Sequence, residues 1–166
     1  MNITRTIARA ILGLVLALGM AHGLLALSSA TGLARPFVVV SGSMEPEIQT
    51  GALLITVPRA TQDLSIGDVV TVYSPLTHKT VTHRLVDIQV VNGETMATLK
   101  GDNNAYADPQ QYVLGATTWV PEVNIPFVGR VMGAFTQPLV LISLAVGVFA
   151  VLLLGFGPAP QRTGRH

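Results

Sequence analysis

Three short strings of the sequence carry side chains that can act together in nucleophilic catalysis. In chain order they are SGSMEP at 41–46, VTHRLV at 81–86 and KGDNNAYAD at 100–108. A serine hydroxyl is a poor nucleophile unless a base lies within hydrogen-bond reach, and a carboxylate commonly orients that base. Ser43, His83 and an aspartate of the third string supply these groups. Their types and order predict the chemistry of a serine hydrolase.

The first string has the features of an exposed nucleophile turn. Gly42 lets the backbone turn sharply before Ser43, and Pro46 stiffens the exit from the turn. Ser41 lies two residues earlier, so the two hydroxyls share one face if the strand persists. The Ser41 hydroxyl and the Ser43 backbone N–H would then stabilise an oxyanion. The alternative is a Ser-Gly-Ser turn without chemistry.

The other two strings offer a base and an acid. His83 falls on a predicted strand and has an imidazole that titrates near neutral pH, as a general base requires. A structural histidine is the alternative. Asp102 and Asp108 are both candidates to orient the imidazole, and spacing alone does not choose between them. Both aspartates also fit ordinary turns, in which Asp and Asn cap the backbone locally.

Strand signals dominate the middle of the chain. The predicted strands are 36–40, 52–57, 68–73, 80–91, 94–99, 112–120 and 126–132. Pro58 is expected to close the second, and Asn92-Gly93 predicts a tight hairpin because both residues tolerate positive φ. No stretch here shows a convincing helical period. The expected fold is a mainly β, antiparallel domain with one transmembrane helix at each end of the chain.

Two apolar runs of 18 residues, 10–27 and 139–156, flank this domain. A helix of that length spans roughly 27 Å, close to the hydrocarbon thickness of a bilayer. Arginines precede the first run and follow the last, which places both termini in the cytoplasm. The predicted organisation is a cytoplasmic N-terminus at 1–9, a transmembrane helix at 10–27, an extracytoplasmic catalytic domain at 28–137, a second transmembrane helix at 138–157 and a cytoplasmic tail at 158–166.

The first run has a second interpretation, as a cleavable signal peptide. Small residues at 26–28 and 28–30 would provide cleavage sites, but 18 residues is long for the apolar part of such a signal. We therefore expect the run to be retained. His22, inside it, is a candidate functional group because ionisable residues are rare within membranes, but a neutral histidine near the interface is the simpler explanation, since only five residues separate it from the end of the run.

Composition excludes several other classes of protein. The chain has no cysteine, so disulfides, zinc thiolates and a cysteine nucleophile are unavailable. The formal net charge is only +1 and no basic stripe is present, which argues against nucleic acid as a partner. No metal site and no cofactor is predicted.

Together, the strings SGSMEP, VTHRLVDI and KGDNNAYAD resemble the conserved boxes of signal peptidase I. They are most similar to the endoplasmic-reticulum and archaeal type, which uses Ser, His and Asp. Most bacterial members use a Ser-Lys dyad instead, with a lysine in the box where this chain has His83. Lys79 is four residues from that slot and Lys100 belongs to the third box.

The resemblance implies a role for each matched residue. Ser43 corresponds to the nucleophile, His83 to the general base, and Asp108 to the usual third member of the triad. Asp102 corresponds to a second important aspartate whose role is uncertain, and Ser41 to a hydroxyl of the oxyanion hole. The implied substrates are signal-peptide-bearing preproteins, cut after small-x-small motifs at the lipid membrane, with partner subunits or a translocon as further partners.

Two other functions remain open from the sequence. A non-catalytic membrane-anchored β module would bind exported peptides without cutting them. A self-cleaving repressor with a related β fold would resemble the Ser-Lys type, but such proteins are soluble and carry a DNA-binding partner domain.

Overall fold

A computed structural model of the chain describes residues 3–135, 142–143 and 145–149. Contacts divide the chain into two units, one of Met1–Leu24 with Ala134–His166 and one of Leu25–Gly133. Helix α1 covers Ile3–Ala30 and therefore extends beyond both ends of the predicted 10–27 span. Its segment Arg9–Ala30 has a mean hydropathy of 2.2 and is 22 residues long, enough to cross a membrane. It is the one candidate span among the described residues.

The second predicted span, 138–157, lies mostly outside the described residues. Those described within it, 142–143 and 145–149, are helical. The fold prediction is thus confirmed for the β domain and for one apolar helix at the N-terminal end.

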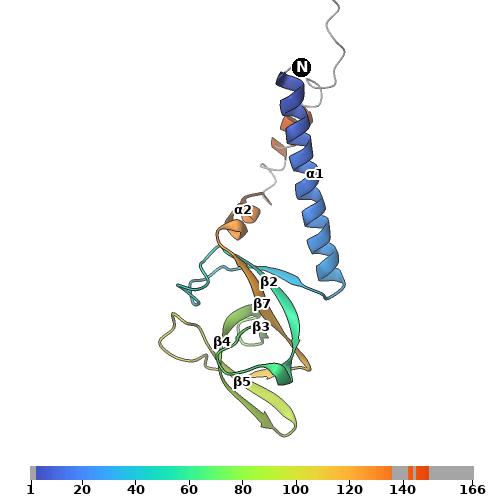
Figure 1. Cartoon of the computed structure of the whole chain (residues 1–166). Coiled ribbons are helices and arrows are strands. Elements are labelled where there is room, and N and C mark those ends of the chain that lie inside the picture. Colours follow the sequence, from blue (N-terminus) through green and yellow to red (C-terminus); the bar gives the residue numbers. More distant parts are fainter. Residues whose placement is uncertain (1–2, 136–141, 144, 150–166) are drawn as a thin grey trace, which may run out of the picture. The chain divides into compact units, whose positions relative to one another are not determined.

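Seven strands form a single antiparallel sheet in the order β1-β2-β7-β3-β4-β5-β6. Their bounds are β1 Arg35–Val38, β2 Leu53–Ala60, β3 Val69–Ser74, β4 Lys79–Val91, β5 Glu94–Lys100, β6 Tyr112–Leu114 and β7 Thr117–Ile125. Strands β2, β7 and β3 lie side by side in the middle of the sheet (Figure 1). A single turn of 3-10 helix, Thr61–Asp63, follows β2.

The predicted hairpin at Asn92-Gly93 is confirmed. Val91 pairs with Glu94 across a two-residue connection, and φ is +53° at Asn92 and +84° at Gly93. Asparagine and glycine adopt such angles at low steric cost, so local chemistry alone sets this turn.

Two strand predictions are wrong in their bounds. Pro58 does not close β2, which continues to Ala60 and pairs Pro58 with Trp119 of β7. Strand β1 pairs with β2 only as far as Thr56, so the missing N–H of Pro58 has no second strand to bond. The segment 112–120, predicted as one strand, forms β6 and the start of β7 with a turn between them.

The strand predicted at 126–132 is also wrong, because helix α2 begins at Val128 and ends at Phe135. Phe127, with φ of +64°, breaks the extended chain just before the helix. The backbone N–H of Arg130 then bonds the carbonyl of Gly51 at 3.1 Å. A side chain at Gly129 would lie 2.8 Å from the carbonyl oxygen of Ala52, so glycine permits this close approach.

The β domain has two apolar clusters. The larger one combines Leu64, which follows the 3-10 turn, with residues of strands β3 to β7: Val70, Leu85, Ala97, Leu99, Tyr112, Leu114 and Val120. The smaller one comprises Met44, Ile48, Ala52 and Leu54. The smaller cluster includes Met44, the residue directly after Ser43. Burial of Met44 therefore anchors the turn that carries Ser43.

Candidate active site

The turn that carries Ser43 follows β1 and is restrained on the C-terminal side of the serine. Met44 is 2% exposed and packs in the smaller apolar cluster. Further along, the Glu45 carboxylate accepts hydrogen bonds from the backbone N–H of Thr50 at 3.3 Å and from its hydroxyl at 2.9 Å. The Ser43 side chain therefore emerges from a backbone that packing and hydrogen bonds restrain.

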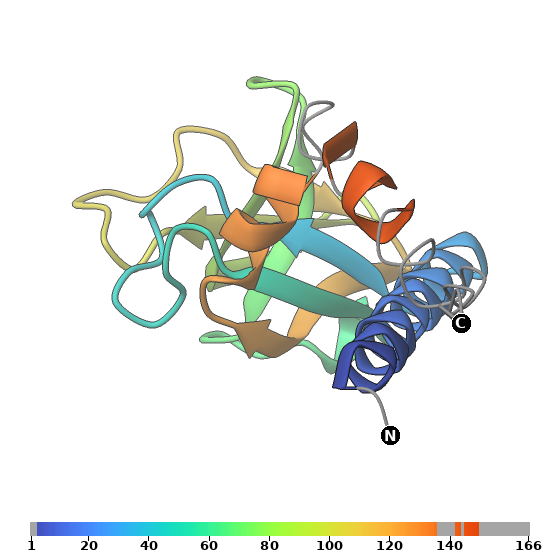
Figure 2. The ribbon, with the colours of Figure 1, turned by 90° about the horizontal axis from the view of Figure 1, so that it is seen from above.

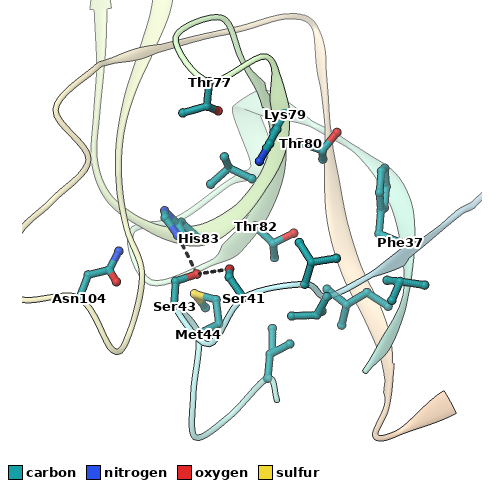
Figure 3. Close-up of a pocket in the computed structure, with 16 residues that line it drawn as sticks. Phe37, Ser41, Ser43, Met44, Thr77, Lys79, Thr80, Thr82, His83 and Asn104 are labelled. Atoms are coloured by element: carbon teal, nitrogen blue, oxygen red, sulfur yellow. Dashed lines mark hydrogen bonds between the residues drawn. The ribbon is translucent and has the colours of Figure 1, made fainter. Parts of the chain in front are cut away.

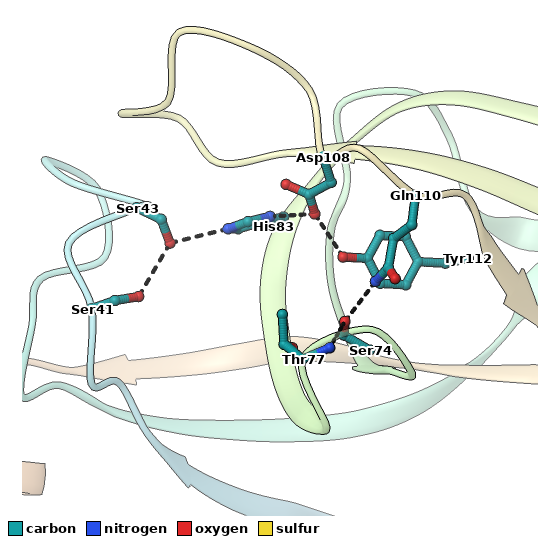
Figure 4. Close-up of polar contacts among 8 residues, drawn as sticks. All are labelled: Ser41, Ser43, Ser74, Thr77, His83, Asp108, Gln110 and Tyr112. Carbon is teal, nitrogen blue, oxygen red and sulfur yellow. Dashed lines mark hydrogen bonds and ion pairs between the residues drawn. The ribbon is translucent and has the colours of Figure 1, made fainter.

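His83 of β4 lies between Ser43 and Asp108 (Figure 4). Its Nε2 atom is 3.1 Å from Ser43 Oγ, and its Nδ1 atom is 2.8 Å from Asp108 Oδ2. The side chains of His83 and Asp108 are each 10% exposed. The histidine, and not a lysine, thus contacts the serine: Nε2 faces the hydroxyl, and the Asp108 carboxylate holds Nδ1.

Asp108 is held by its own backbone and by a tyrosine. Its N–H donates to the carbonyl of Leu99 at 2.8 Å, and the Tyr112 hydroxyl donates to Asp108 Oδ2 at 2.8 Å. Burial raises the pKa of Tyr112. Nothing in the sequence marks Tyr112 as a site residue, because its place on an apolar strand is that of a core residue.

The structure does not bring Asp102 into contact with His83. Instead, both carboxylate oxygens of Asp102 accept hydrogen bonds from Arg84, at 2.8 Å from Nε and 2.6 Å from a terminal nitrogen. The same terminal nitrogen lies 2.6 Å from Glu47. The hydrogen bond from Arg84 lowers the pKa of Asp102, and the Asp102 carboxylate in turn raises the pKa of Arg84. Arg84 was also missed, although it directly follows His83.

The loop at 101–108 hydrogen-bonds the backbone of the serine turn. The backbone N–H of Asn103 donates to the carbonyl of Ser43 at 2.8 Å, and the Asn103 side chain donates to the carbonyl of Gly42 at 3.1 Å. Seen from above, this loop (yellow) and the serine turn (cyan) project from the same side of the β domain (Figure 2). The third string thus positions the serine backbone as well as supplying Asp108.

Close packing at Gly101 leads to a prediction. A Cβ atom there would lie 2.6 Å from the carbonyl oxygen of Ser43. We expect Gly101→Ala to shift the serine turn, to lower the free energy of unfolding by about 1–3 kcal/mol and to reduce catalysis. Gly115→Ala is the matched control, since a Cβ there meets nothing closer than 4.0 Å. Thermal unfolding and activity of both variants test this, and equal behaviour of the two would contradict it.

A groove of about 590 Å³ opens beside Ser43 and His83 (Figure 3). Its walls are the segments 37–41 and 79–83, with Met44, Ile48 and Leu54 among the apolar lining residues. Strand β1 is an end strand of the sheet, and β4 pairs with β5 only from Arg84 onward. Each wall therefore presents one side of its backbone without a strand partner, which is the arrangement that an added peptide strand needs.

The hydroxyl of Ser41 also lies in this groove, 3.4 Å from Ser43 Oγ. Within the part of the chain that the structure describes, no group of three or more His, Asp or Glu side chains could hold a metal ion. Ser43, His83 and Asp108 have the geometry that defines the class of serine hydrolases.

Comparison with known proteins places the chain within that class. No family model matches it. Signal peptidase I W of Bacillus subtilis is 46% identical over 72 residues, which are 42% of this chain and 37% of that protein. The signal peptidase complex catalytic subunit SEC11 of Metarhizium robertsii is 32% identical over 137 residues, 77% of this chain and 80% of that protein. SEC11 of Candida tropicalis is 34% identical over 102 residues, 57% of this chain and 61% of that protein.

The chain belongs to the signal peptidase I family, in the branch that includes the SEC11 catalytic subunits. The match with the Bacillus subtilis protein covers well under half of that protein's length.

Proposed function

We propose that this chain is a membrane-bound serine endopeptidase that removes N-terminal signal peptides from exported preproteins after small-x-small motifs. The observation that carries the proposal is the Ser43–His83–Asp108 chain of hydrogen bonds at one end of a peptide-sized groove. Among the described residues, no contact favours the alternative of a non-catalytic peptide-binding module.

In the first chemical step, Ser43 Oγ attacks the scissile carbonyl carbon and His83 Nε2 accepts the hydroxyl proton. The 3.1 Å contact between these atoms gives the proton a direct path. Asp108 accepts the hydrogen bond from His83 Nδ1–H, which fixes the tautomer with a free lone pair on Nε2 and stabilises the imidazolium that forms.

The tetrahedral oxyanion is stabilised by the backbone N–H of Ser43 and by the hydroxyl of Ser41. When the intermediate collapses, His83 protonates the leaving amine and an acyl-enzyme on Ser43 remains. A water molecule, deprotonated by His83, then hydrolyses this ester and restores the free serine. Asp102 takes no direct part, because Arg84 binds both of its oxygens.

The preprotein binds in the groove as an extended strand between the edges of β1 and β4. Backbone hydrogen bonds hold it there, and they are independent of sequence. Selectivity for the two small side chains of the small-x-small motif then depends on the shape of the apolar lining around Met44 and Leu54.

Cleavage of a matched pair of preproteins by the purified full chain in detergent tests this function. The first preprotein carries an Ala-x-Ala site, and in the second the alanine directly before the cut is replaced by leucine. We expect a single cut after Ala-x-Ala and at least a tenfold lower kcat/KM for the leucine form. Equal cleavage of both, or cleavage of neither, would contradict the proposal.

The proposed topology has two spans, 10–27 and 138–157, with the β domain on the extracytoplasmic side. Support comes from the apolar segment Arg9–Ala30 and from the arginines at both ends of the chain. The membrane lipid and the preprotein are then partners. The names of the fungal relatives refer to a signal peptidase complex, so partner subunits are also proposed here.

The absence of native cysteine allows a clean test of this topology. Glu94→Cys places a thiol beside the exposed hairpin, and Gln161→Cys places one near the C-terminus. In spheroplasts, a membrane-impermeant maleimide is expected to label the first variant directly and the second only after detergent is added. Labelling of Gln161→Cys without detergent, or protection of Glu94→Cys, would overturn the topology.

A further inference from the structure

A buried tyrosine shares the carboxylate that contacts the histidine. Asp108 Oδ2 accepts two hydrogen bonds, one from His83 Nδ1 and one from the Tyr112 hydroxyl, each 2.8 Å long (Figure 4). Tyr112 is 4% exposed and belongs to the larger apolar cluster, so packing fixes its ring. The hydroxyl is thus presented to Asp108 by the core of the domain and not by a mobile loop.

We propose that Tyr112 is a positioning residue for the proposed peptidase, holding the Asp108 carboxylate in the plane that His83 requires. This inference rests on the proposed function and adds a fourth member to the hydrogen-bond relay of Ser43, His83 and Asp108. Asp108 lies in the connection between β5 and β6, where its side chain could otherwise rotate. A second donor on the same oxygen limits that rotation and shares the negative charge.

Two further polar side chains, Gln110 and Ser74, lie near Tyr112 (Figure 4). Gln110 also donates to Ser74 Oγ at 2.6 Å, and Ser74 is fully buried at the end of β3. Ser74 Oγ also accepts from the backbone N–H of Thr77 at 3.2 Å, so these neighbouring polar groups bond one another while the tyrosine hydroxyl donates to Asp108.

The charged groups around His83 allow a pH profile to report on this contact. They are Asp108 in direct contact, Asp102 with its partner Arg84, and Lys79, which lines the same groove. Arg84 lowers the pKa of Asp102 and burial raises the pKa of Tyr112. Neither group therefore titrates between about pH 5 and 9, so a change there reflects the pair of Asp108 and His83.

The test is Tyr112→Phe, which removes one oxygen and keeps the ring in the core. Without the tyrosine hydrogen bond, the Asp108 carboxylate stabilises the imidazolium form of His83 more strongly, and that form must lose its Nε2 proton before it can act as a base. We expect kcat for preprotein cleavage to fall about tenfold with KM unchanged, and the acidic limb of the pH profile to move up by about 0.5–1 pH unit.

Thr118→Val is the matched control. It removes a buried hydroxyl of β7 that hydrogen-bonds Thr61 at 2.9 Å and is not a member of the relay. It should lower the unfolding temperature while leaving kcat and the pH profile unchanged. The inference is overturned if Tyr112→Phe behaves like this control.

Failure of the proposed function and failure of the role of Tyr112 would give different results. If the wild-type protein cleaves no preprotein, the proposed function fails. If the wild-type protein is active and the pH profile of Tyr112→Phe is unaltered, only the role of Tyr112 is wrong. If Tyr112→Phe does not fold, Gln110→Leu replaces it, since this change removes the donor to Ser74 beside the tyrosine and leaves the ring in place. A smaller shift in the same direction supports the inference, and an unchanged profile overturns it.

Discussion

Replacing Ser43 by alanine is expected to reduce kcat on the order of 10⁴- to 10⁶-fold, because the atom that forms the covalent intermediate is lost. His83 would keep its contact with Asp108, so the fold and the groove should survive the change. Ser41→Ala is the comparator. Its hydroxyl lies in the same groove, yet it would supply only one oxyanion donor, for which a loss of roughly 10²-fold is expected.

Single-turnover kinetics in detergent, with one preprotein and the two variants side by side, measures this difference. The unfolding temperatures of both variants should match that of the wild-type protein, since each change removes one half-buried or exposed oxygen. A greater loss for Ser41→Ala than for Ser43→Ala would reverse the roles of the two serines.

Replacing Asp108 by asparagine is expected to lower kcat by roughly 10⁴-fold. An asparagine amide can donate to His83 Nδ1, which would favour the tautomer that carries its hydrogen on Nε2. That tautomer cannot accept the proton of Ser43. The loss should thus fall on kcat, with KM for the preprotein little changed.

Asp102→Asn is the matched change at the second aspartate. Arg84 would lose an ionic partner but keep its contacts with Glu47 and with the carbonyl of Gly67. The pair is partly exposed, so we expect a stability loss of about 1 kcal/mol and a decrease in kcat of less than about tenfold. If Asp102→Asn were inactive while Asp108→Asn worked, the assignment of Asp108 to the relay would be wrong.

Local patterns in the sequence predict much of the sheet. Alternating β-branched residues and the Asn92-Gly93 turn place β4 and β5 close to their observed bounds, because side-chain shape and φ preference act within a few residues. The errors occur where tertiary contacts decide. Pro58 stays within β2 because no strand lies on its second side, and 128–135 is helical although its first residues resemble a strand.

In the site, too, some features follow from local sequence and others depend on tertiary contacts. The three strings identify Ser43, His83 and two candidate aspartates, since residue type and order carry that information. The choice between the aspartates depends on where the loop at 101–108 turns. It directs Asp102 to Arg84 and Asp108 to His83. Tyr112 could not be found in advance, because its ring fits a core strand and only the folded chain shows where its hydroxyl points.

The central claim is that Ser43 cuts preproteins at the end of the signal peptide. The measurement that tests it most directly is the N-terminal sequence of the product released from one preprotein by the wild-type chain and by Ser43→Ala. The account predicts one new N-terminus, directly after the small-x-small motif, from the wild-type protein and none from the variant. The same new N-terminus, formed at the same rate by Ser43→Ala, would contradict it.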